Sequence, residues 1–175
     1  QVFANASGWV LEAGSALSGN DNTDADPEVL VAIGELSTSI GAADITEVEM
    51  VTTTADKSEG FTISVRVRYN EPVDVVTTGG TPTLAVTNGN EGTGTGRGPH
   101  SLSYASGTGT NELIFSLAIA AANAATNADD VLSVGAQTIA LNSGTIKDAS
   151  GTASDAALVI SGAVGTAAGS VTVTA

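Results

Sequence analysis

The chain has 175 residues, enough for one ordinary domain with additional segments but not for two full domains. Its 5 Lys and Arg residues stand against 19 Asp and Glu residues, and the formal net charge of -14 argues against binding of nucleic acid, whose phosphates it would repel. The absence of cysteine and the single histidine exclude thiol catalysis, disulfide bonds, cysteine-ligated metals and a multi-histidine metal site within one chain. No apolar run approaches the roughly 20 residues that span a bilayer, so we expect no membrane insertion.

Residues 1–44 are predicted to form an acidic arm that precedes the main domain. The first 56 residues contain ten acidic residues and no basic one, and 1–44 lacks the alternation of a strand. Asp26 is a suitable N-cap, and Pro27 suits a first helical position. Apolar residues at helical spacing then predict a short helix over 27–40: Val29, Leu30, Ile33, Leu36 and Ile40. Its apolar side would pack either on the chain's own domain or on a neighbouring subunit.

Residues 45–161 have the pattern of short β-strands. Over 61–69 apolar residues alternate with Thr, Ser and Arg, which predicts a half-buried strand. Six shorter candidates, each bounded by Gly, Asn, Asp or Pro, are 47–53, 83–87, 101–105, 112–119, 137–141 and 157–161. The glycine-containing segment 106–111 predicts a hairpin turn. About seven strands predict an all-β fold, an antiparallel β-sandwich. The tail, 162–175, ends in a further strand that would pair with this sheet or be donated to another subunit.

Three motifs in this region resemble those of one protein family. They are FTISVRVRYNEPVDVVTTGGTPTLAVTN over 61–88, SYASGTGTNELIF over 103–115 and LNSGTIKDASGT over 141–152. Their types and intervals are similar to those of the bacterial Ig-like repeats of large surface and adhesin proteins. The resemblance covers about 45–161 and implies an Ig-like sandwich. It extends neither to the acidic arm nor to the tail, and the long loop 88–99 departs from the family pattern.

The family usually occurs as tandem repeats that act as spacers, whereas this chain contains one copy. One copy cannot supply length, so we expect it to work by attachment. Ig-like domains of this kind resemble those on the outside of tailed-phage particles. The resemblance therefore implies a non-enzymatic capsid decoration protein on the virion exterior, docking in many copies on the shell protein or on copies of itself. The alternative is a bacterial cell-surface or adhesin module that binds glycan or another cell. An enzyme is the weakest hypothesis, because no spacing among the 19 acids selects a catalytic pair.

Carboxylates at expected strand ends are candidate calcium ligands, because the resemblance implies that modules of this type can bind calcium between loops. The candidates are Glu71, Asp74, Asp148 and Asp155. The alternative is that they are ordinary polar loop residues. The acidic segment 20–28 partly matches the spacing of an EF-hand, but Val29 occupies the position that requires glycine. No other cofactor is expected.

Candidate interface residues lie in the arm and in one loop. Trp9 is the only tryptophan, and Phe3, Leu30 and Ile33 are the other large apolar candidates in the arm. Trp9 packs either on its own domain or on a partner. The glycine-rich loop 89–98 lacks the Gly-Lys-Ser/Thr ending of a phosphate-binding loop. With Arg97 and the adjacent His100 it is expected to be an exposed contact loop.

Overall fold

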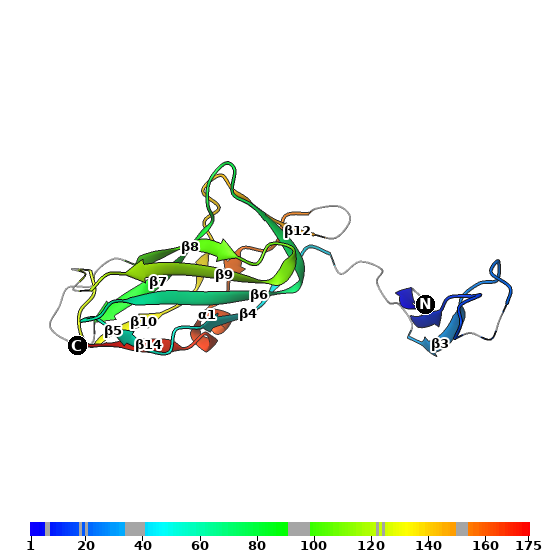
Figure 1. Cartoon of the computed structure of the whole chain (residues 1–175), viewed down its shortest axis with the longest axis horizontal. Helices are drawn as coiled ribbons and strands as arrows, with labels where there is room; N and C mark the ends of the chain where they lie inside the picture. Colours follow the sequence, from blue (N-terminus) through cyan, green and yellow to red (C-terminus); the bar gives the residue numbers. More distant parts are fainter. Residues whose placement is uncertain are drawn as a thin grey trace. The chain divides into compact units, whose positions relative to one another are not determined.

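The computed structural model describes residues 1–5, 8–17, 19, 21–33, 41–90, 99–121, 123, 125–149 and 154–175. These residues form two compact units, Gln1–Gly41 and Ala42–Ala175, which Figure 1 shows in blue and in cyan to red. Nearly all of the regular secondary structure described in each unit is β-strand.

The first unit is a three-stranded antiparallel sheet. Its strands are β1 (Val2–Asn5), β2 (Gly8–Leu11) and β3 (Glu28–Ala32), in the order β1-β2-β3. The helix predicted over 27–40 is therefore wrong at 28–32, and 34–40 lies outside the described residues. The apolar positions chosen for the helix belong to an unbroken apolar run, 29–33, that is rich in β-branched residues. Such a run favours a strand, and pairing with β2 decides the matter.

The second unit is an antiparallel β-sandwich, as the sequence predicts. Its main strands are β4 (Ile45–Met50), β5 (Ala55–Asp56), β6 (Phe61–Val76), β7 (Thr83–Asn90), β8 (His100–Ser106), β9 (Thr110–Ile119), β10 (Asp130–Ser133) and β14 (Ser170–Thr174). Neighbouring strands follow the order β4-β6-β9-β8-β7-β10-β14-β5. In chain order β4, β6, β7, β8, β9, β10 and β14 follow the order of strands A to G of an immunoglobulin-type sandwich. Here, however, β8 (D) also pairs with β7 (C), so the strands form one continuous hydrogen-bonded path.

The two ends of this strand path come from one short stretch of chain. β4 pairs with β6, whereas β5, a few residues later, pairs in parallel with β14. The tail thus pairs within its own unit, on one side with β10 and on the other with β5, which is the first of its two predicted alternatives. Because both edges are connected through 45–56, the sandwich is closed around a single core.

The core is apolar and poor in aromatic residues. Inward positions of β6 alternate as the sequence predicts, and Ile63, Val65 and Val67 are fully buried. Tyr104 and Phe115 meet edge to face, with their ring centroids 6.1 Å apart. The predicted hairpin at 106–111 is confirmed, and Gly107 and Gly109 have the positive φ angles that its turn requires.

The connection from β10 to β14 has its own structure. It contains β11 (Gln137–Thr138), β12 (Thr145–Asp148), β13 (Val159–Ile160) and the short helix α1 (Gly162–Ala167). β12 pairs with the last four residues of β6, 73–76. In Figure 1 this end of β6 extends beyond the sandwich. Here two of the family-like motifs meet backbone to backbone. A Cβ on Gly80 would lie 1.6 Å from the Asn142 carbonyl oxygen, and a Cβ on Gly144 would lie 2.3 Å from the Gly80 oxygen.

Candidate functional site: the three-stranded N-terminal unit

The first unit exposes most of its large apolar side chains. Seven of them, on or next to its strands, are between 41% and 52% exposed: Val2, Phe3, Trp9, Val29, Leu30, Val31 and Ile33. Among its described residues, Val10 and Leu11 are the large apolar side chains that are buried. The unit therefore presents outward the type of residue that normally forms a core.

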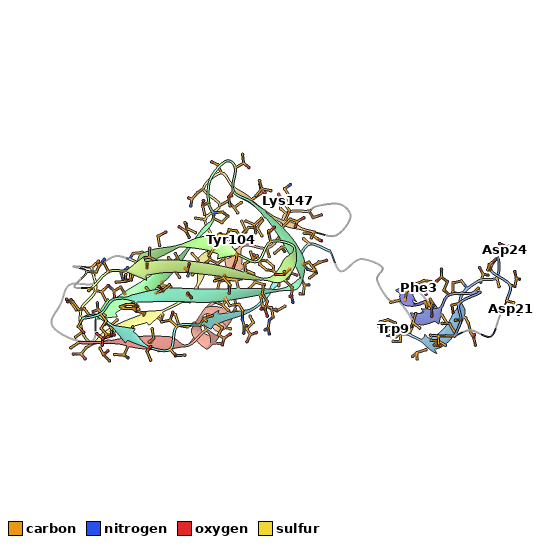
Figure 2. All side chains as sticks on the ribbon, in the orientation of Figure 1. Phe3, Trp9, Asp21, Asp24, Tyr104 and Lys147 are labelled. Carbon is orange, nitrogen blue, oxygen red and sulfur yellow. The ribbon has the colours of Figure 1, made fainter. Side chains whose placement is uncertain are left out.

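Both faces of this sheet carry exposed apolar side chains. Trp9 stands opposite Ala4 on one side and Val31 on the other, so these three residues share one face. Phe3 and Val10 are also paired, and because side chains alternate they lie on the opposite face. Figure 2 shows Phe3 and Trp9 at one end of the unit, with the labelled carboxylates of the loop at the other end. Asp21 and Asp24 therefore lie away from the two aromatic side chains.

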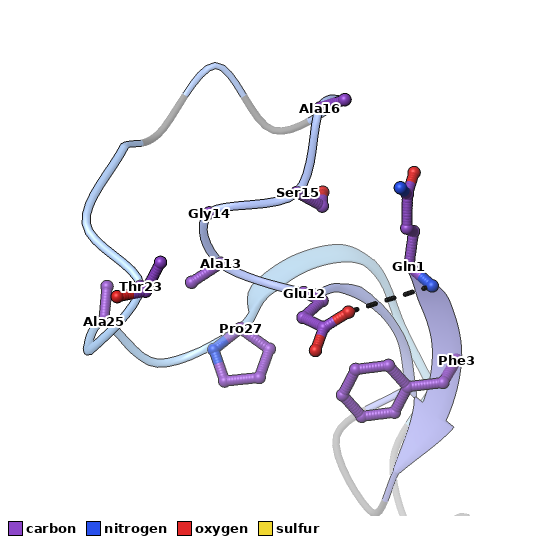
Figure 3. Close-up of a pocket in the computed structure, with 10 residues that line it drawn as sticks. All are labelled: Gln1, Phe3, Glu12, Ala13, Gly14, Ser15, Ala16, Thr23, Ala25 and Pro27. Carbon is purple, nitrogen blue, oxygen red and sulfur yellow. Dashed lines mark ion pairs between the residues drawn. The ribbon is translucent and has the colours of Figure 1, made fainter.

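A pocket of about 620 Å³ lies between β1 and the loop that leads to β3 (Figure 3). It is lined mainly by small side chains: Gln1, Phe3, Glu12, Ala13, Gly14, Ser15, Ala16, Thr23, Ala25 and Pro27. The Glu12 carboxylate lies 3.9 Å from the amine of Gln1. The lining residues offer one carboxylate and two hydroxyls, without an imidazole or second carboxylate to act as a base. This lining suits contact with a peptide segment better than acid–base chemistry.

The structure places four of the predicted interface residues on the first unit. Phe3, Trp9, Leu30 and Ile33 are all exposed on the first unit. Arg97 lies outside the described residues. The prediction that His100 is an exposed loop residue is wrong: it begins β8, is buried, and its Nε2 lies 3.2 Å from Thr126 Oγ1. Burial lowers the pKa of His100, with a partly opposing effect from the charge of Asp130.

Three of the four predicted calcium ligands lie along the pairing of β6 with β12 and the adjoining segment. Asp74 is paired with Lys147 across the two strands, and the Lys147 ammonium lies 3.3 Å from Asp155. Asp148, the next residue of β12, is paired with Val73 and is buried on the opposite face. The Lys147 ammonium therefore already neighbours Asp74 and Asp155. Within the described part of the chain, no three His, Asp or Glu side chains converge as a metal site would require. Calcium binding by Glu71, Asp74, Asp148 and Asp155 stays a prediction.

The outward side of β4, β6 and β9 carries an ion-pair network. Arg68 bonds to Glu112 at 2.7 Å and to Glu47 at 2.6 Å, and Arg66 pairs with Glu49 and Glu112. The hydrogen bond from Arg68 lowers the pKa of Glu112, and Glu112 in turn raises the pKa of Arg68. Both arginines are therefore engaged within the sandwich, and this face is not an anion-binding patch.

Sequence reasoning did not single out Asn88, Thr126 and Asp130, which are buried polar residues next to His100 in the fold. One signal was present in the sequence. Asn88 continues the inward alternation of Leu84 and Val86, so a polar side chain occupies a predicted core position.

No protein-family model, curated protein or solved structure matches this chain. Among the described residues, no helix is long and apolar enough to cross a membrane.

Proposed function

We propose that this protein is a non-enzymatic structural attachment protein that decorates the outside of a phage capsid in many copies. The single observation that carries the proposal is the first unit, a small sheet with apolar residues on its surface, attached to a well-packed sandwich. In this arrangement the sandwich is displayed outward, and the first unit docks on the shell protein.

The size of the first unit supports a docking role. A domain of about 40 residues usually needs disulfides, metals or association to be stable. This unit spans Gln1–Gly41 in a chain without cysteine, and it buries few large apolar side chains. The exposed parts of its seven apolar residues amount to on the order of 600 Å² over both faces of the sheet, so a partner that contacts both faces would be needed to approach the roughly 800 Å² of a standard interface. A partner surface would supply the missing core.

Charge supports a partner other than a second copy of this unit. Residues 1–41 contain six Asp and Glu residues and no Lys or Arg. Bringing two such units together would bring like charges together, whereas a partner with a cationic rim would be attracted. The acidic character of the whole chain also suits an exterior location, because it reduces nonspecific binding to genome and to anionic surfaces.

Quantitative peptide mass spectrometry on purified virus particles and on host envelope fractions tests this assignment. We expect many copies per particle, on the scale of the shell protein. Detection in the envelope fraction alone would reject decoration. It would favour the second candidate, a bacterial surface or adhesin module, to which the three Ig-like motifs at 61–88, 103–115 and 141–152 also point.

A variant pair tests the docking surface itself. Phe3→Ser combined with Trp9→Ser should strongly reduce the number of copies that rebind to stripped particles, because both apolar faces lose an anchor. Leu17→Ser is the matched control, since Leu17 is an exposed apolar residue of the same unit outside its strands. Trp9 is the only tryptophan, so its fluorescence should shift to the blue when wild-type protein docks. Equal rebinding of the double variant and the control would contradict the proposal.

A further inference from the structure

Four polar side chains are buried together at one end of the otherwise apolar sandwich. Asn88, His100, Thr126 and Asp130 are at most 7% exposed. Asn88 is paired with Leu132 and Asn90 with Asp130, so Asn88 and Asp130 are diagonal neighbours on adjacent strands. Cross-strand diagonal neighbours have Cα atoms about 7–8 Å apart, within reach of one bridging atom between polar side chains.

Part of this cluster holds a turn in place. The Asn88 amide nitrogen donates to the Ala125 carbonyl, and the His100 ring contacts Thr126. The Asn127 backbone N–H donates to Asp130 Oδ2 at 2.7 Å. These bonds fasten the chain between β9 and β10 to the ends of β7 and β8. They account for one side-chain polar atom of Asn88 and one of Asp130.

One side-chain oxygen of each of these two residues is not involved in these bonds. Asn88 Oδ1 and Asp130 Oδ1 are buried, and neither accepts a hydrogen bond from any residue that the structure describes. None of the ion pairs found among those residues involves Asp130. A buried carboxylate with an uncompensated oxygen is costly, so it calls for a cation or an additional donor. Two acceptor oxygens from adjacent strands, one of them a carboxylate, are ligands for a hard cation.

We propose that Asn88 Oδ1 and Asp130 Oδ1 bind a calcium ion. Amide and carboxylate oxygens belong to the normal calcium ligand set, and backbone carbonyls and water complete its flexible shell. Magnesium fits less well, because it requires near-octahedral geometry and retains most of its water. A site with one carboxylate has an affinity near that of extracellular modules, with a Kd of about 0.1–1 mM. The bound ion would fasten the turn before β10 to β7 and make the stability of the sandwich depend on calcium.

This site is distinct from the carboxylates near β12. Asp74 and Asp155 already have the Lys147 ammonium as a neighbour, whereas Asp130 faces the core between β7 and β10. The inference does not depend on the proposed capsid role.

Thermal unfolding of the full-length protein tests the proposal. After chelator treatment, the Tm is measured at rising calcium or magnesium concentration and constant ionic strength. At ten times the Kd we expect calcium to raise the Tm by about 4 °C, with a smaller effect of magnesium. Asp130→Asn should remove the calcium-dependent rise. Asp129→Asn is the matched control, because it changes charge equally at an exposed neighbouring residue and should keep the rise.

Each alternative outcome is decisive. No calcium effect beyond that of magnesium in the wild-type protein would overturn the proposal and assign the two oxygens to a bound water. A calcium effect that persists in Asp130→Asn but disappears in Asp74→Asn would overturn it in favour of the β6–β12 carboxylates. If Asp130→Asn does not fold, Asn88→Asp replaces it: a second carboxylate should tighten calcium binding about tenfold in calorimetry. Unchanged affinity in that variant would contradict the site.

Discussion

Gly80 lies in close backbone contact with the segment around Asn142, so we expect that adding one methyl group at Gly80 strongly lowers the stability of the protein. In Gly80→Ala the new Cβ would lie 1.6 Å from the Asn142 carbonyl oxygen, whereas ordinary contacts begin at 3.4 Å. The two backbone segments would have to separate by roughly 1.8 Å. Three of the bonds across this junction are the Thr83–Ala140 backbone pair, at 2.8 and 3.0 Å, and the bond from Asn142 Nδ2 to the Thr81 carbonyl at 2.9 Å. That displacement stretches all three past hydrogen-bonding distance.

Losing three such bonds at about 1 kcal/mol each gives a destabilisation of about 3 kcal/mol for Gly80→Ala. For a sandwich of this size, this corresponds to a Tm lower by about 10 °C. Urea unfolding followed by far-UV circular dichroism measures the effect, because strands of the second unit dominate that signal. Gly135→Ala is the control, since a Cβ there has no atom within 4 Å, and its stability should change by less than about 0.5 kcal/mol. Equal unfolding midpoints for the two variants would refute the reasoning.

Three further predictions concern single side chains. Because the Arg68 bond lowers the pKa of Glu112 from its ordinary 4.5, the stabilisation is present above pH 4.5 and is lost as the pH falls through the lowered value. Glu112→Gln should therefore flatten the acid limb of a Tm-against-pH curve. Burial lowers the pKa of His100 below its ordinary 6.5, so the unfolded state binds the proton more readily and stability should fall as the pH drops below about 6.5. In His100→Asn that step should disappear, and a step of unchanged size would assign it to another group. The Ser161 hydroxyl accepts from the Val164 N–H at the start of α1, so Ser161→Ala should cost about 1 kcal/mol in urea unfolding, and no loss would mean that this cap contributes nothing.

Local alternation was enough to predict most strands of the sandwich. The segment 61–69 lies within β6, which continues to Val76, the tail 170–174 matches β14, and the turn at 106–111 is where it was expected. β10 and β12 were not predicted, because each has four residues and such a run is too short for alternation to be distinctive. α1 was missed for the same reason, since one and a half turns contain no full apolar stripe.

The predictions of site residues were likewise limited to what the local sequence determines. Four apolar residues of the first 44 were predicted as interface candidates, with packing on the chain's own domain as the alternative. Whether their segment formed a helix or a sheet depended on a partner strand distant in sequence. His100 was assigned to a loop because its neighbours are glycine-rich, and its burial follows from the pairing of β7 with β8.

The amino-acid sequence determines the all-β class, the alternating inward positions and the acidic charge, because each depends on residue type or on neighbours two positions apart. The tertiary structure alone decides the strand order, the contact of Gly80 with Asn142 and the meeting of Asn88 with Asp130. The two contacts join segments that are more than 40 residues apart, and the strand order combines such pairings with shorter ones. A sheet accepts many pairings of locally similar strands, and the choice is made only when all of them bury their apolar faces in one core.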